Sequence, residues 1–518
     1  MRRLPAWLPA AVLAALYLVL RPPSADLAAQ TYRTWLFEHA GFTLWDNGWY
    51  AGHHVPAYSV LFPPLAALLG PRLVGALSAV AAAWAFERLV VGQRGEAGRP
   101  AALWFATATA VVLVTGRLTF GLGVAFGVAA VLALARGWRL AAALLAVATA
   151  LASPVAAAFL ALGLTAWGLT HRRDGRRALA AGLLAAALAP AAILSVLFPE
   201  GGDFPFAADA FLPTLAVTLL VLALLPREQR TLRLGIAFYA LLLVASAALS
   251  TPMGGNAARL GALFAGPVAA FALWPHRRVA LLLIAPVLVY WQVSTPIDDW
   301  ARAAGDGSVA VSYYAGVVRF LDGRIAADGP FRVEIPFTDN HWETARVAPY
   351  VPLARGWERQ LDRKVNALFY DNRPLTAAGY RRWLDDNAVA YIALADAPID
   401  YSAAAEAALV RSRPSYLHEV WRDAHWRVYA VSRPAPLARG AARVTRLDSD
   451  AVVLEATRPG RVALRVRWTP YWRLAEGHGC VERDGDWTAL TLTRPGRVRL
   501  APAFALSRVG ATGPRCVG

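Results

Sequence analysis

The chain has 518 residues, of which 57% are hydrophobic, and its mean hydropathy is +0.41. Because 17% of the residues are charged, this composition excludes a protein that lies wholly within a membrane, and a soluble part must accompany the apolar segments. The formal net charge of +17 is carried almost entirely by arginine. Arginines in loops beside lipid headgroups explain this charge better than nucleic-acid binding, which we exclude as a function.

Apolar stretches of about 15 to 20 residues, long enough for membrane helices, recur along the first part of the chain. We expect spans near residues 4–20, 72–91, 101–116, 118–135, 139–152, 155–170, 178–198, 212–226, 234–249, 257–275 and 279–293. This makes about eleven membrane helices, although neighbours joined by the shortest turns could merge. The first span lacks a small-residue cleavage site and is expected to be retained.

Arginines fall mainly in the gaps on one side of this series of spans. They are Arg2, Arg3, Arg88, Arg94, Arg99, Arg136, Arg139, Arg172, Arg173, Arg176, Arg177, Arg227, Arg230, Arg233, Arg277 and Arg278. The alternate gaps are acidic, with Glu200, Asp203 and Asp209 in one, or almost uncharged. The positive-inside rule makes the arginine-rich gaps cytoplasmic. With an odd number of spans, we expect a cytoplasmic N-terminus and an extracytoplasmic C-terminal part.

Residues 294–437 have the mixed pattern of a soluble α/β domain. Residues 332–337 alternate as a strand, 376–386 are expected to form a helix that leads into a strand at 388–394, and 416–431 are expected to form two strands. The two strands would turn at Asp423 and Ala424. Together with the spans, this predicts a transmembrane domain at 1–293 followed by an extracytoplasmic α/β domain.

Residues 438–518 show short alternating strands and predict an extracytoplasmic β-sandwich domain. The sequence Thr-Arg-Pro-Gly-Arg-Val occurs at 457–462 and again at 493–498. Because Pro-Gly favours turns, we interpret the repeat as two similar hairpins rather than two binding sites.

The only two cysteines, Cys480 and Cys516, lie in this last domain. In an oxidising compartment they would form a disulfide that closes a loop of about 35 residues and stabilises the domain by about 3 to 4 kcal/mol. A reduced or metal-bound pair is the alternative, but no nearby group of histidines and cysteines supplies further ligands, and His478 is read as a loop residue.

The predicted outer loop at 21–71 is about fifty residues long, which is unusual and typical of functional loops. Ser24 is a candidate N-cap for a helix that Gly41 ends. Leu27, Tyr32, Trp35, Leu36 and His39 share one face of this helix, whereas Gln30, Arg33 and Glu38 lie elsewhere. Such a helix is expected in the membrane interface. Residues 57–70 are apolar but too short to span, so we expect them to be re-entrant or interfacial.

Four features occur here in order: Asp26 just after the first span, the interfacial helix, Trp-Asp-Asn-Gly-Trp-Tyr-Ala-Gly at 45–52, and Phe-Pro-Pro-Leu at 62–65. This order resembles the GT-C superfamily of polytopic glycosyltransferases. It is most similar to bacterial membrane proteins related to 6-pyruvoyl-tetrahydropterin synthase, which lack that activity. The resemblance covers about residues 1–295 and implies a multi-pass protein of the bacterial plasma membrane with a GT-C-like fold.

The resemblance implies a polyprenyl-phosphate-linked sugar as donor, with an acidic residue of the first outer loop as general base. That role falls on Asp26, with Asp46 as a second candidate or auxiliary group. A carboxyl group beside a low-dielectric interface has a raised pKa and is a better base. The alternatives are that Asp26 is an ordinary helix-start carboxylate and that Asp46 forms a turn before Asn47 and Gly48.

Further residues are expected to bind the substrate. Arg117 and Arg259 interrupt the positive-inside pattern, and Arg259 follows Asn256 at a helix start, where an anion is favoured. Arg259 could instead snorkel or cap a neighbouring helix. The remaining candidates from the loop are Trp45, Trp49, Tyr50, His53 and His54.

No cofactor and no metal are expected. His53 and His54 could bind a divalent metal together with Asp46, but adjacent histidines point apart on a regular backbone.

We therefore expect an integral membrane glycosyltransferase that acts at the outer face of the membrane on a cell-envelope glycan or protein acceptor. One alternative is a transporter or flippase of lipid-linked sugar, against which stand the near absence of charges inside the spans and the absence of a repeat that relates two halves. Another is a non-catalytic GT-C relative that binds envelope polysaccharide.

Overall fold

The computed structural model describes residues 4–171, 175–274, 276–371 and 373–517. Arg2, Arg3, Arg172 and Arg173 of the predicted cytoplasmic gaps lie outside these residues. The chain divides into two compact units: the first comprises 1–30, 57–195 and 201–304, and the second comprises 31–56, 196–200 and 305–518. We call them the helical unit and the C-terminal unit.

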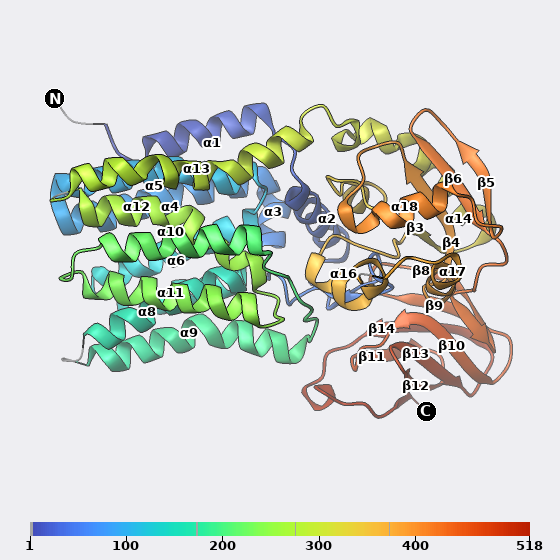
Figure 1. Ribbon diagram of the computed structural model, residues 1–518. Helices are drawn as coiled ribbons and strands as arrows, with labels where there is room; N and C mark the ends of the chain where they lie inside the picture. The colour runs from blue at the N-terminus through green and yellow to red at the C-terminus, as the bar shows by residue number, and fades with distance from the viewer. Residues whose placement is uncertain (1–3, 172–174, 275, 372, 518) are drawn as a thin grey trace. The chain divides into compact units, whose positions relative to one another are not determined.

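The helical unit consists of long, roughly antiparallel helices (Figure 1). They are α1 (Leu8–Leu20), the start of α2 (Ala25–Ala40), α3 (Phe62–Leu69), α4 (Pro71–Arg94), α5 (Arg99–Val114), α6 (Leu118–Ala135), α7 (Arg139–Ala152), α8 (Pro154–Thr170), α9 (Arg176–Leu197), α10 (Ala208–Leu224), α11 (Arg230–Ala248), α12 (Ala258–Leu273) and α13 (Arg278–Ala303). Each of the predicted apolar segments corresponds to one of these helices.

By length and composition, six helical stretches of the described chain are able to cross a membrane, or seven if the bent pair α1 and α2 forms one span. One stretch, Pro71–Val114, contains both α4 and α5, which pack against each other across a short 3₁₀ turn at Gly95–Gly98. Three more apolar helices, α7, α8 and α10, are shorter. The positions of the predicted segments are therefore confirmed, whereas the number of crossings stays a prediction.

Prolines and small residues explain how these helices begin and pack. Pro71 and Pro154 are the first residues of α4 and α8, where a missing N–H costs no helical hydrogen bond. The Ser153 hydroxyl caps α8 by accepting from the Ala156 N–H at 3.3 Å. A Cβ at Gly123 of α6 would come within 2.7 Å of the Ala156 Cβ, so a glycine is needed for α6 and α8 to approach this closely.

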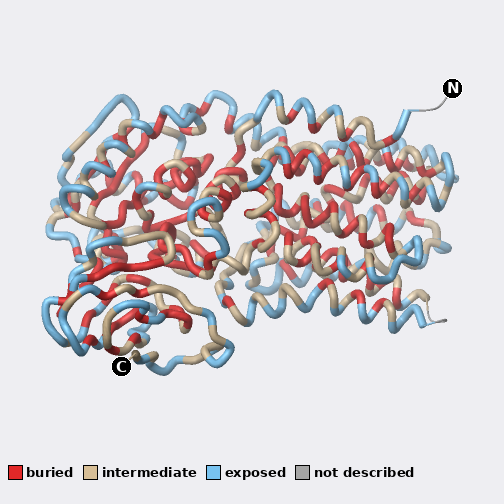
Figure 2. The backbone as a smooth tube through the Cα atoms, turned by 180° about the vertical axis from the view of Figure 1, so that it is seen from behind, coloured by how far each residue is buried: buried red, intermediate tan, exposed pale blue. Residues whose placement is uncertain are grey.

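The outward sides of these helices contain many exposed positions (Figure 2), and a number of these are large apolar residues. Examples are Leu144, Leu241, Leu282 and Leu283, which are exposed by 61%, 64%, 63% and 74%. An apolar surface of this extent would be unstable in water and fits a lipid environment. The helical unit therefore has the surface of an integral membrane protein.

The connections between helices separate into two ends of the helical unit. The predicted cytoplasmic arginines of the α4–α5, α6–α7, α10–α11 and α12–α13 connections lie at one end, and the α1–α2, α5–α6, α7–α8 and α11–α12 connections lie at the other (Figure 1). This segregation is the pattern that the positive-inside rule produces. Which end faces the cytoplasm stays a prediction.

The C-terminal unit contains an α/β part that matches the predicted elements. Its helices and strands are α14 (Ala315–Asp328), β3 (Arg332–Glu334), α15 (Glu343–Arg346), α16 (Arg359–Val365), α17 (Ala377–Asp386), β4 (Val389–Ala395), α18 (Ala404–Arg411), β5 (Leu417–Arg422) and β6 (Trp426–Val431). The sheet order is β3-β4-β6-β5, with β3 parallel to β4 and the other pairs antiparallel. Thr376 caps α17 by accepting from the Gly379 N–H.

Two antiparallel sheets form the last part of the chain. The strands are β7 (Ala438–Gly440), β8 (Ala442–Leu447), β9 (Val452–Ala456), β10 (Gly460–Arg467), β11 (Trp472–Glu476), β12 (Gly479–Asp484), β13 (Trp487–Leu492), β14 (Gly496–Pro502) and β15 (Arg515–Val517). One sheet has the order β15-β12-β13-β10-β7 and the other β11-β14-β9-β8. Alternate apolar side chains such as Leu454, Val462 and Leu490 are buried in a shared core, as in a β-sandwich.

The repeated Pro-Gly sequences do not close hairpins, so that prediction is wrong. The first connects β9 to β10 and the second connects β13 to β14, and in both cases the two strands belong to different sheets. Each repeat therefore carries the chain from one sheet to the other. Pro-Gly turns the backbone in either situation, and the partner of each strand is decided by the packing of the sandwich.

The predicted disulfide is confirmed. Cys480 of β12 and Cys516 of β15 are bonded to each other and lie in register as neighbouring strand residues. The bond attaches the last strand of the described chain to the edge of its sheet.

Three further expectations need correction. α13 runs to Ala303, about ten residues beyond the predicted end of the last span, because Pro296 is accommodated inside the helix. Residues 31–56 of the predicted outer loop group with the C-terminal unit rather than with the helices. The helix α2 does not turn all its polar residues to one exposed side: Gln30 and Arg33 are 1% and 5% exposed. Both bind half-buried partners, Tyr58 at 3.2 Å and Glu358 at 2.6 Å.

Candidate functional site

Three of the predicted site residues meet within the helical unit. The Asp26 Oδ2 lies 3.3 Å from the Arg117 Nε and 4.0 Å from the Arg259 Nη2. The three side chains are partly exposed, by 33%, 26% and 22%. We call this group the charged cluster. It lies at the end of the helical unit opposite to the arginine-rich connections.

The backbone at Ser24 and Gly116 brings Asp26 to Arg117. The chain bends by 77° between α1 and α2, and Asp26 lies in the first turn of α2. Gly116 has a φ of +69° in a turn, and a Cβ there would come within 2.3 Å of the Ser24 Oγ. Only glycine allows this approach and this backbone conformation. Arg117 follows directly and precedes α6.

Arg259 is the second residue of α12, and a tight turn before the helix holds it in place. The 3₁₀ turn Gly254–Ala257 precedes α12, and the Asn256 side chain donates to the Pro252 carbonyl at 3.1 Å. Asn256 is 4% exposed. The structure therefore places Asn256 in the turn that positions Arg259, and a contact of Asn256 with substrate stays a prediction. The Arg259 guanidinium also lies 5.8 Å from the centre of the Phe120 ring.

The sequence did not predict that α13 contributes a carboxylate, Asp299, to the charged cluster. Asp299 interacts electrostatically with both Arg117 and Asp26, and its carboxylate pairs with Arg302 one turn later. The group thus holds the three arginines Arg117, Arg259 and Arg302 against the two carboxylates of Asp26 and Asp299. Since the expected span ended before Asp299, this part of the helix was treated as a soluble segment. The excess positive charge favours an anionic ligand.

A small apolar cavity lies between α4, α5, α6 and α12 of the helical unit. Its lining comprises Gly75, Ala79, Ala82, Thr109, Val112, Leu113, Leu118, Gly121, Val124 and Leu263. Leu118 follows Arg117 in the chain, and Leu263 lies one turn after Arg259. The cavity has a volume of only about 10 Å³, so an acyl or prenyl chain would need these side chains to move apart.

Asp46, the second predicted acid, has a different environment. It is fully buried in the C-terminal unit, where its carboxyl group accepts from the Tyr32 hydroxyl at 3.0 Å and from the Gly48 N–H at 2.9 Å. Burial raises the pKa of Asp46 from 3.8 to about 7. The bond to Gly48 is that of the turn-forming alternative. We infer that Asp46 holds this loop in place.

Replacing Asp46 with asparagine is expected to change how stability depends on pH. Folding raises the pKa of the Asp46 carboxyl group from 3.8 to about 7. The protonated carboxyl group therefore stabilises the folded protein fully below pH 3.8, and this stabilisation is lost as the pH rises through 7. The shift corresponds to roughly 4 kcal/mol at most. Asp46→Asn keeps an acceptor for Tyr32 and Gly48 but cannot ionise. Thermal unfolding of the purified proteins between pH 5 and 8 should show that the Tm of Asp46→Asn increases relative to that of the wild type as the pH rises.

Asp46→Ala is the matched control, because it removes the acceptor along with the charge. It should destabilise the protein at every pH by leaving the Gly48 N–H unsatisfied. Parallel pH profiles for the wild type and Asp46→Asn would show that Asp46 is ionised throughout and would contradict its burial as a neutral acid.

The aromatic candidates also lie inside the C-terminal unit. Trp45 packs edge-on against Trp472 with ring centres 5.4 Å apart, and Trp49 stacks on Tyr32 at 4.3 Å. The Tyr50 hydroxyl accepts from the Glu358 N–H at 2.8 Å. These contacts make the Trp-Asp-Asn-Gly-Trp-Tyr stretch an anchor of the fold, and its role in substrate binding stays a prediction.

The two histidines have separate partners. The His53 Nδ1 is 3.8 Å from the Asp46 Oδ2, whereas the His54 Nδ1 lies 2.9 Å from Glu200 and its Nε2 lies 2.9 Å from the Thr469 hydroxyl. Burial lowers the pKa of His53 to about 4, so its ring is neutral near pH 7. Within the described residues, no three side chains of histidine, cysteine, aspartate or glutamate are arranged to hold a metal ion.

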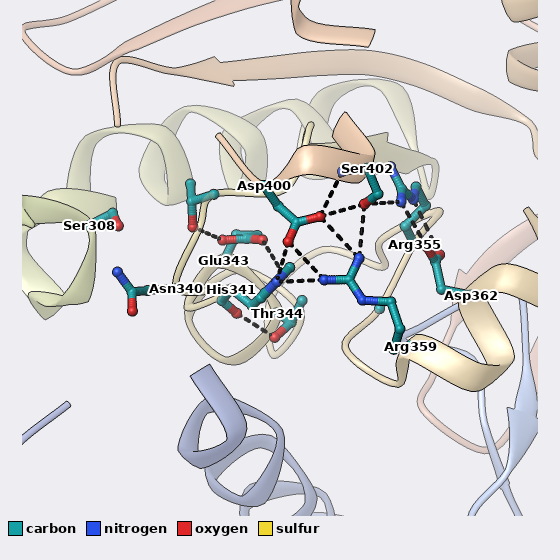
Figure 3. A network of polar contacts seen from close by, with 12 residues as sticks. Ser308, Asn340, His341, Glu343, Thr344, Arg355, Arg359, Asp362, Asp400 and Ser402 are labelled. Atoms are coloured by element: carbon teal, nitrogen blue, oxygen red, sulfur yellow. Dashed lines mark hydrogen bonds and ion pairs between the residues drawn. The ribbon is translucent and has the colours of Figure 1, made fainter. Parts of the chain in front are cut away.

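The C-terminal unit also contains a buried ionic network that the sequence did not predict (Figure 3). Arg355 pairs with Asp362 at 2.7 Å and with Glu406 at 3.2 Å, and all three side chains are at most 1% exposed. Beside it, Asp400 binds Arg359 at 2.7 Å and lies 3.4 Å from His341. These charges come from segments far apart in the chain, which is why no local motif shows them. Their burial indicates that they hold the segments together.

Comparisons with known proteins add little at the level of sequence. No protein-family model and no curated protein sequence matches the chain. Among solved structures, it is similar to the arabinofuranosyltransferase AftD from Mycobacteria, with a TM-score of 0.47 and 14% identity over 96% of this chain and 57% of that one. A mutant of that protein aligns with a TM-score of 0.47 and 15% identity, over 96% of this chain and 60% of that one.

The chain thus spans less than two thirds of either structure. Arabinofuranosyl transfer is a property of those proteins, and a similarity at this level does not carry it over. The match to the pterin-synthase-related membrane proteins stays a prediction.

Proposed function

We propose that this protein is an integral membrane glycosyltransferase of the GT-C type, which takes a sugar from a polyprenyl-phosphate donor at the outer face of the bacterial plasma membrane. The observation that carries the proposal is the meeting of Asp26 with Arg117 and Arg259. A donor of this class has three parts, a prenyl chain, a phosphate and a sugar. The charged cluster suits the phosphate, whereas the apolar cavity would have to widen to take a prenyl chain.

In this proposal the arginines bind the phosphate and Asp26 acts on the acceptor. Guanidinium groups bind phosphate oxygens through charge-assisted hydrogen bonds and stabilise the charge that develops on the leaving phosphate. The Asp26 carboxylate then accepts the proton of the acceptor hydroxyl or amide as that group attacks the sugar. The new glycosidic bond to the acceptor replaces the bond between the sugar and phosphate, and the proton of the acceptor goes to Asp26.

The observed contacts give the charged cluster a further property. Because Asp26 is the counterion of both arginines, a donor phosphate would compete with Asp26 for them. Binding of the donor would then weaken the ion pairs of Asp26 and make its carboxylate available as a base. Asp299 would keep part of the positive charge compensated meanwhile.

Purified protein incubated with a panel of polyprenyl-phosphate sugars and envelope acceptors tests the function. Turnover supports a transferase. Binding of the donor without turnover would support the non-catalytic alternative, and movement of intact lipid-linked sugar across proteoliposomes would support a flippase.

Cysteine labelling in intact cells tests the orientation. Both native cysteines are in the disulfide, so an introduced cysteine is the only free thiol. Arg177→Cys, at the start of α9 and before the expected span, should react only with membrane-permeant reagents, and Ala327→Cys, on α14, should react with impermeant ones. Both positions are exposed, so accessibility within the fold does not limit either reaction. Equal labelling of the two by an impermeant reagent would overturn the orientation.

A further inference from the structure

The C-terminal unit has a groove of about 760 Å³ that the proposed function does not use. It lies around the end of α18, where the helix leaves the sheet formed by β4, β6 and β5. Four arginines line it, namely Arg411, Arg413, Arg422 and Arg427. We call it the arginine groove. Its volume is in the range of roughly 300 to 1,000 Å³ that is typical of small-molecule sites.

The strand register places two of these arginines directly opposite each other. Arg422 of β5 pairs with Arg427 of β6, so both side chains leave the same face of the sheet. Like charges in this position are destabilising unless an anion lies between or beside them. Arg422 and Arg413 share Glu419, at 3.8 and 3.1 Å. Among the described residues, Arg427 and Arg411 have no ion-pair partner, and all four arginines are exposed.

The two carboxylates of the groove are already engaged in holding its wall. Asp423 accepts from the N–H groups of His425 and Trp426, both at 2.8 Å, and so fixes the turn between β5 and β6. Asp396 accepts from the Tyr313 hydroxyl and lies 3.2 Å from the His425 ring. The acids therefore shape the groove, while the guanidinium groups keep donors for a ligand.

The mixture of groups indicates which ligand fits. Guanidinium groups bind carboxylates and phosphates through paired hydrogen bonds. The second lone pairs of the two aspartates can accept from hydroxyl groups. The wall is rigid, because the His425 ring stacks on Tyr313 with centres 4.7 Å apart and the Trp426 indole donates to the Tyr313 carbonyl at 2.9 Å. A ligand with both hydroxyl groups and negative charges uses all of these features.

We propose that the arginine groove binds a short segment of an anionic glycan, whose sugars carry carboxylate or phosphate groups. A nucleic acid or an anionic membrane fits less well, because its phosphates are closely spaced, whereas the sugar hydroxyl groups between the charges of a glycan can donate to the two aspartates. The binding site stands on the geometry of the groove alone. Only its use as the site for the acceptor of sugar transfer rests on the proposed function.

Binding of charged oligosaccharides to the full-length protein in detergent tests the proposal. Trigalacturonate and a phosphate-bearing trisaccharide are titrated by calorimetry, with a neutral trisaccharide as reference. We expect binding of at least one charged ligand, weakened about 10-fold or more in the double variant Arg422→Gln/Arg427→Gln, since both guanidinium groups lose their charge-assisted contacts to the ligand. The two ligands show whether carboxylate or phosphate is preferred.

The double variant Arg458→Gln/Arg494→Gln is the matched control. It removes the same charge from two exposed arginines of the repeated sequences in the β-sandwich, and it should leave binding within about twofold of the wild type. An equal loss in both double variants would show that only net charge matters and would overturn the proposal.

Other outcomes are equally clear. Absence of binding by either charged ligand overturns the site, and so does binding only to anionic vesicles or an oligonucleotide. Unchanged thermal unfolding of the variants excludes misfolding as the cause of a loss. If sugar transfer fails in every assay while groove binding persists, the proposed function is wrong and the glycan site still stands.

Discussion

Asp26→Asn is expected to lower the rate constant of sugar transfer at least about 100-fold without weakening the binding of the donor. Asparagine has nearly the same volume as aspartate but cannot accept the proton of the acceptor. The ion pairs of Asp26 with Arg117 and Arg259 add a second expectation. Removing this counterion leaves both arginines free for phosphate, so the donor should bind as well as before or more tightly. Steady-state kinetics with the donor varied at saturating acceptor separates the two effects.

Arg259→Ala is expected to produce the opposite pattern. The loss of a charge-assisted contact to phosphate costs roughly 1.5 to 3 kcal/mol and should weaken donor binding about 10-fold or more. Arg259→Lys keeps the charge but lacks the paired donors, so it should fall between the wild type and Arg259→Ala. The two sites thus control for each other, one through the rate constant and the other through donor affinity.

Asp209→Asn serves as the control for loss of a carboxylate, because Asp209 is exposed at the start of α10. It should transfer sugar at the wild-type rate. If Asp26→Asn only weakened donor binding, Asp26 would position the arginines and would not be the base. If Asp26→Asn were fully active while Asp46→Asn were inactive, the enzyme assignment would survive with a different base. Full activity in both variants would contradict the GT-C mechanism.

Arg355→Met is expected to destabilise the C-terminal unit by about 3 to 5 kcal/mol. The substitution keeps most of the side-chain volume, yet it leaves Asp362 and Glu406 buried without their counterion. It also removes a cation that lies 4.0 Å from the centre of the Phe337 ring. Amide hydrogen exchange in β4 and α18 should accelerate strongly, while the helices α4 to α6 should exchange as in the wild type.

Arg382→Met is the control, since Arg382 is an exposed residue of α17. It should change the free energy of unfolding by less than about 0.5 kcal/mol. Adding Glu406→Gln to Arg355→Met should recover part of the loss, because one uncompensated charge is removed. Wild-type exchange rates in Arg355→Met would show that the buried network contributes little and that apolar packing alone holds these segments.

The sequence by itself determined the helices, the gathering of arginines in alternate connections and the disulfide. Each apolar segment forms a helix because backbone groups in an apolar environment must be paired within the segment, and this requirement is local. Turn signals such as Ser153 and Thr376 act within one helical turn, and they too were visible in the sequence. The two cysteines had only each other as partners in the chain.

The tertiary structure decided which side chains meet. The repeated Pro-Gly turns were recognised, yet only the packing of two sheets shows that they connect strands of different sheets. Asp26, Arg117 and Arg259 were each visible in the sequence, whereas the participation of Asp299 depends on how far α13 continues. Partners that are hundreds of residues apart, such as Asn47 and Asp448, leave no local pattern. Local preferences fix the elements, but contacts between distant elements depend on the whole fold and appear only when it is assembled.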